Sequence, residues 1–126
     1  YDDYADTGSF AAYAGVDLGG GSQALRATEK EFELIRSTKV SDAELHKAKS
    51  YLKGKLVMNL EDSENVANMI AHQQLFYDRF FSLEEQKELI DSVTAEQVQA
   101  VAQELLDPKN LVLTIIGPFT DEQIEF

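Results

Sequence analysis

The chain contains no cysteine, and basic residues are scarce in it. The absence of cysteine excludes a disulfide framework and any reaction that uses a thiol. Only 11 Lys and Arg residues stand against 23 Asp and Glu residues, so the formal net charge is −12. This excess of negative charge argues against nucleic acid or an anionic membrane surface as the partner. No apolar run approaches the roughly 18 residues of a membrane-spanning helix, so no membrane segment is expected in this chain.

The composition is that of a folded globular protein. Hydrophobic residues make up 44% and aromatic residues 10% of the 126 positions, which is enough for one domain with a modest core. The charge is unevenly spread: residues 61–126 hold 14 acidic and 3 basic residues, whereas residues 39–55 hold 5 basic and 2 acidic ones. The basic stretch is either a docking face for an acidic partner or a solvated helix face whose lysines flank apolar positions.

The helical pattern predicts five helices. The longest begins after Ser41, which forms a capping box with Glu44, and its apolar positions recur at helical spacing: Leu45, Ala48, Leu52 and Leu56. Gly54 inside it costs about 1 kcal/mol relative to Ala, so a close contact with another element is expected there. The other four helices are expected at about 23–38, at about 64–77, from Ser82, and from Thr94 to the stop at Pro108.

Two segments read as strands, at residues about 8–16 and 111–117. The second is apolar almost throughout, as in a strand covered by other elements. Each is the only available neighbour of the other, so the expected fold class is α+β, with a few-stranded antiparallel sheet packed by about five helices. A two-stranded sheet is marginal in water, and an apolar strand left at an edge invites pairing with another chain. The sequence therefore predicts self-association.

The order of several short motifs along the chain is similar to that in a known enzyme family. The motifs are Asp6-Thr7-Gly8 leading to Phe10 and Tyr13, Leu52-Lys53-Gly54, His72-Gln73-Gln74-Leu75, Thr94-Ala95-Glu96-Gln97-Val98, and Gly117-Pro118. In this order they resemble the non-catalytic half of the pitrilysin/insulinase-type (M16) zinc metallopeptidases. Relatives in that family are the mitochondrial processing peptidase subunits and the core proteins of the respiratory bc1 complex.

The resemblance implies that residues 1–126 form a single partial domain, the C-terminal inactive half-domain of a peptidase lobe, which opens mid-domain at Tyr1. The zinc site of the family is an inverted His-x-x-Glu-His motif. The chain has only His46 and His72, and neither has that neighbourhood. The resemblance therefore supplies no catalytic residue and no metal ligand here, and it places the zinc in a partner domain or subunit that carries the motif.

The function implied is a non-catalytic piece of a zinc metalloendopeptidase, which would form part of the peptide-enclosing chamber and of the inter-domain interface. The alternative is a structural subunit without peptidase activity, like the bc1 core proteins. Either way, the partner expected is the catalytic domain or subunit, with a peptide as substrate of the full protein.

Four aromatic residues are candidates for the chamber or the interface. Phe10 and Tyr13 are expected on opposite faces of a strand, one buried and the other lining the chamber, unless both pack between sheet and helices. Phe80 and Phe81 follow the third helix and serve either as core anchors or in a contact between lobes. Asp42 and His46 are spaced i,i+4, but two side chains make an incomplete metal site that an exposed helix face explains as well.

Overall fold

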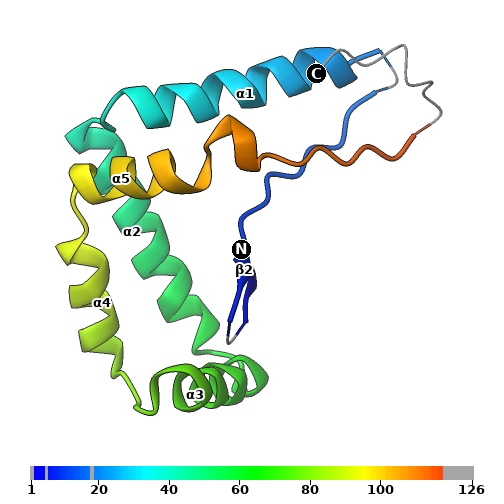
Figure 1. Cartoon of the computed structure of the whole chain (residues 1–126). Helices are drawn as coiled ribbons and strands as arrows, with labels where there is room; N and C mark the ends of the chain where they lie inside the picture. The colour runs from blue at the N-terminus through cyan, green and yellow to red at the C-terminus, as the bar shows by residue number, and fades with distance from the viewer. Residues whose placement is uncertain (1, 5, 18, 118–126) are drawn as a thin grey trace. The chain divides into compact units, whose positions relative to one another are not determined.

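The computed structural model describes residues 2–4, 6–17 and 19–117, and five α-helices dominate it (Figure 1). They are α1 (Gly21–Ser37), α2 (Asp42–Asn59), α3 (Ser63–Tyr77), α4 (Leu83–Ser92) and α5 (Ala95–Leu105), followed by the 3-10 helix η1 (Pro108–Asn110). The five predicted helices are confirmed. Among the described residues, no helix is long and apolar enough to cross a membrane. The chain divides into two compact units, Val40–Val98 and the remainder.

The predicted α+β sheet is wrong. The only strand pairing among the described residues is a two-residue antiparallel ladder between β1 (Asp2–Asp3) and β2 (Gly8–Ser9), in which Asp3 lies opposite Gly8. Residues 10–17 form no strand, and neither do residues 111–117. The first of these segments is rich in alanine and glycine, which have low β-propensity, and its side chains are exposed, so nothing holds it against a neighbour. The fold is mostly helical.

Local hydrogen bonds explain why the helices begin where they do. The capping box predicted at Ser41 is present, and Ser82, the expected start of a later helix, also forms one; each is completed by a glutamate three residues on. Thr94 and Gln97 exchange the equivalent pair of bonds at 2.8 and 3.3 Å. Asp62 rather than Ser63 caps α3, because the Asp62 carboxylate accepts from two backbone N–H groups of the first turn.

In the unit Val40–Val98, α2 lies beside α4 (Figure 1). The partly covered positions of α2 are Leu45, Lys49, Lys53, Leu56 and Leu60. Two lysines therefore occupy this face, whereas Ala48 and Leu52, which were predicted to belong to it, are exposed. The helix turns by 100° per residue, so Tyr51, Gly54 and Met58 lie on the opposite face, and all three are exposed.

Gly54 does not have the close contact that its position in a long helix led us to expect. A Cβ added to it would meet nothing within 4 Å, apart from its own helix backbone. No packing among the described residues therefore explains a glycine at this position, which is unfavourable for a helix.

In the other unit, α1 runs beside the part of α5 that begins at Gln99 (Figure 1). Ala102 on α5 and Leu106 directly after it are the buried apolar residues of this unit among those described. Leu106 N–H donates to the Ala102 carbonyl at 3.0 Å. The helical i→i−4 hydrogen-bonding pattern therefore continues to the buried Leu106. The small core of this unit thus lies at the C-terminal end of α5.

Candidate functional site

The two predicted site residues near the N-terminus are both exposed. Tyr13 is 96% exposed, and Phe10 is more than half exposed although its ring lies 6.4 Å from the Phe32 ring on α1. The expectation that one of the pair is buried is wrong, because the strand that would have sorted the two side chains onto opposite faces does not form. Both rings instead contribute to the apolar surface of this unit.

Phe80 and Phe81 lie in the connection between α3 and α4, where aromatic side chains gather. Phe81 is partly covered: the Tyr77 ring meets its ring edge-on at 5.7 Å, and the Arg79 guanidinium lies 4.3 Å from its centroid. Phe80 is more than half exposed. The neighbouring residues thus have different environments, Phe81 inside the connection and Phe80 on its surface.

Two glutamine side chains hold the backbone of Phe81. The Phe81 N–H donates to Gln73 Oε1 at 2.8 Å, and the Phe81 carbonyl accepts from Gln86 Nε2 at 3.1 Å. Gln73 on α3 is only 6% exposed, and Gln86 belongs to α4. The backbone N–H and C=O of Phe81 are thus both hydrogen-bonded, by side chains from two different helices. These bonds fix the backbone of the connection between α3 and α4 at Phe81.

A second polar contact joins α2 to the C-terminal end of α4. Lys53 Nζ lies 2.7 and 2.9 Å from the two carboxylate oxygens of Asp91, and Lys49 Nζ donates to the Asp91 backbone carbonyl at 2.8 Å. Lys49 and Lys53 are one helical turn apart, so they reach the same residue. The last carbonyls of a helix carry partial negative charge, so lysines are favourable partners for them.

This contact should make stability depend on pH. The hydrogen bond from Lys53 lowers the pKa of Asp91 below its ordinary value of 3.8. Desolvation opposes the shift, and the charge interactions with Lys53 and Lys49 add to it. A carboxylate whose pKa is lower in the folded state stabilises the fold above its unfolded value, and this contribution is lost as pH falls through the folded value.

We therefore expect the stability difference between the wild type and Lys53→Met to shrink as pH falls below 3.8. The measurement is the urea midpoint of both proteins from neutral pH to about pH 3. Lys55→Met is the matched control, because Lys55 lies exposed on the same helix; its difference from wild type should stay constant with pH. A pH-independent difference for Lys53→Met would show that Lys53 does not act through the Asp91 carboxylate.

The two histidines lie on different helices, His46 on α2 and His72 on α3. The His72 ring stacks on the Phe76 ring at 4.5 Å. Within the part of the chain that the structure describes, no group of three or more His, Cys, Asp or Glu residues is placed to hold a metal ion. The expectation that neither histidine belongs to a metal site thus rests on their separate positions and on the ring contact of His72.

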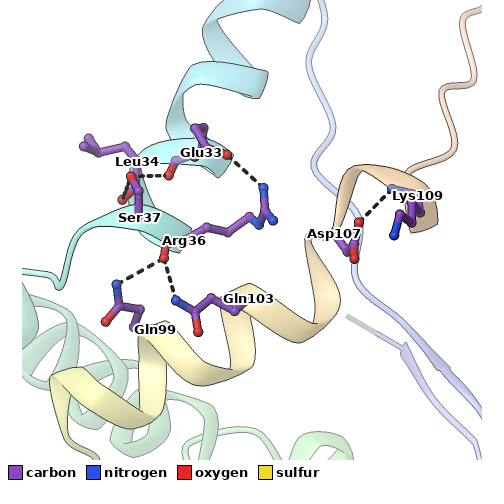
Figure 2. Close-up of polar contacts among 8 residues, drawn as sticks. All are labelled: Glu33, Leu34, Arg36, Ser37, Gln99, Gln103, Asp107 and Lys109. Carbon is purple, nitrogen blue, oxygen red and sulfur yellow. Dashed lines mark hydrogen bonds and ion pairs between the residues drawn. The ribbon is translucent and has the colours of Figure 1, made fainter.

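Figure 2 shows a third polar contact, where α5 meets the C-terminal end of α1. Gln99 Nε2 and Gln103 Nε2 both donate to the Arg36 carbonyl, at 3.1 and 3.0 Å. Beside it, Arg36 pairs with Glu33 at 2.8 Å, and the Ser37 hydroxyl donates to the Glu33 carbonyl at 2.7 Å. The glutamine bonds occupy a carbonyl that the last turn of a helix leaves without a helical partner.

Sequence reasoning did not find these three contacts. Two of them join residues that are distant in sequence, and the third depends on how the connection between α3 and α4 folds around Phe81. Glutamine or lysine on a helix is ordinary composition. The one available signal was spacing: Lys49 and Lys53, like Gln99 and Gln103, are i,i+4 pairs, which places both members on one helix face.

Comparison with known proteins identifies relatives over nearly the whole chain. An uncharacterized zinc protease of Mycobacterium leprae is 28% identical over 122 residues, which are 97% of this chain and 27% of that protein. A zinc protease of Streptomyces coelicolor is 31% identical, over 95% of this chain and 26% of its own length. The mitochondrial-processing peptidase subunit beta of Rattus norvegicus is 30% identical, over 91% of this chain and 23% of its own length.

The chain is a homologue of M16 zinc proteases. The resemblance to this family is therefore confirmed. No protein-family model and no solved structure matches the chain significantly. The chain spans about a quarter of the length of the curated relatives it matches.

Proposed function

We propose that this M16 homologue is a non-catalytic part of a zinc-dependent endopeptidase and that it forms part of the wall enclosing the peptide. In this proposal residues 1–126 are a single partial domain, the C-terminal inactive half-domain of a peptidase lobe. The observation that carries it is the similarity to named zinc proteases over at least 91% of the chain, combined with a span of about a quarter of their length.

The zinc of the full protein would belong to a partner domain or subunit with a His-x-x-Glu-His motif, which activates water for attack on the peptide bond. The positions of the two histidines support this assignment. The motif brings two histidines together on one helix, whereas His46 and His72 lie on α2 and α3. The ring of His72 is also engaged by Phe76.

Exposed apolar side chains support the role in the chamber wall and the inter-domain interface. Tyr13, Phe10 and Phe80 present most of their surface to solvent, as do Tyr51 and Met58 on the outer face of α2. Aromatic residues and methionine are enriched at protein–protein contact surfaces. The open space at Gly54 on that same face would allow the backbone of a partner element to approach α2 closely. Phe81, which its glutamine partners hold in place, would position Phe80 for such a contact.

The catalytic assignment is tested by zinc titration and peptide cleavage with the purified chain. We expect no stoichiometric zinc binding in calorimetry and no cleavage of a fluorogenic peptide. The double variant His46→Ala/His72→Ala serves as the control and should behave like the wild type. Stoichiometric zinc binding that disappears in the double variant would overturn the assignment of the metal to another domain.

The chamber assignment is tested in the assembled protein that includes the zinc-bearing domain. Tyr13→Ala should raise the KM for peptide, because the variant removes an exposed ring from the proposed chamber wall. Tyr4→Ala is the matched control, since Tyr4 is another exposed tyrosine near the N-terminus. Equal KM values for both variants and the wild type would remove Tyr13 from the chamber.

A further inference from the structure

We draw no further inference here: the strongest candidate, the exposed face of α2 that carries Tyr51, Gly54 and Met58, is an unpartnered surface, and nothing in the part of the chain that the structure describes shows what covers it.

Discussion

Replacing Leu106 with alanine is expected to lower the free energy of unfolding by about 2–5 kcal/mol, the range for truncating a buried leucine. Leu106 is 7% exposed and lies with Ala102 in the small core at the C-terminal end of α5. Truncation removes apolar contacts and leaves a cavity that a helix end cannot fully close. The measurement is urea denaturation followed by circular dichroism.

The neighbouring Leu105 provides the matched control. It has the same side chain one position earlier but is 50% exposed. Leu105→Ala should therefore cost less than about 1 kcal/mol, in the range of partly exposed positions. Equal losses for the two variants would contradict a core centred on Leu106.

The second large effect is expected for Gln73→Met, which keeps the length of the side chain but removes its hydrogen-bond acceptor. The partly buried Phe81 N–H then loses its partner, which costs about 1–3 kcal/mol. Urea denaturation measures this loss, and hydrogen exchange adds a local reading. The Phe81 amide should exchange faster in the variant, because its bond to Gln73 Oε1 is absent.

Gln74→Met is the control for this variant. Gln74 is exposed and donates to the Asp78 carboxylate at 2.6 Å, next to the end of α3. Its replacement should change stability by no more than about 0.5 kcal/mol, as is usual at the surface. If Gln73→Met left both stability and Phe81 exchange unchanged, the glutamine would not define the connection between α3 and α4.

The helices could be predicted from sequence because their signals are local. Ser41 with Glu44, and Ser82 with Glu85, contain within four residues everything that a helix start needs. The strands could not be predicted in the same way. A strand needs a neighbouring strand to pair with, and the sequence pattern of a single segment does not show whether that neighbour exists. Residues 111–116 are apolar except for Thr114, yet no described segment pairs with them.

The face of α2 shows the same limit. Apolar spacing selected Ala48 and Leu52 for the packed side, whereas Lys49 and Lys53 occupy it, because Asp91 at the end of α4 gives them polar partners. The family was recognisable because it depends on the order of motifs along the chain, which packing does not alter. The expected burial of either Phe10 or Tyr13 depended on the predicted sheet. Because that sheet does not form, both residues are exposed.

The polar contacts of the two units should respond differently to ionic strength. The two bonds to the Arg36 carbonyl come from the neutral amides of Gln99 and Gln103, so added salt should weaken these two bonds little. The contact between α2 and α4 instead depends on ammonium groups at the surface. High salt should therefore weaken the lysine contacts to Asp91 more than the glutamine bonds to the Arg36 carbonyl.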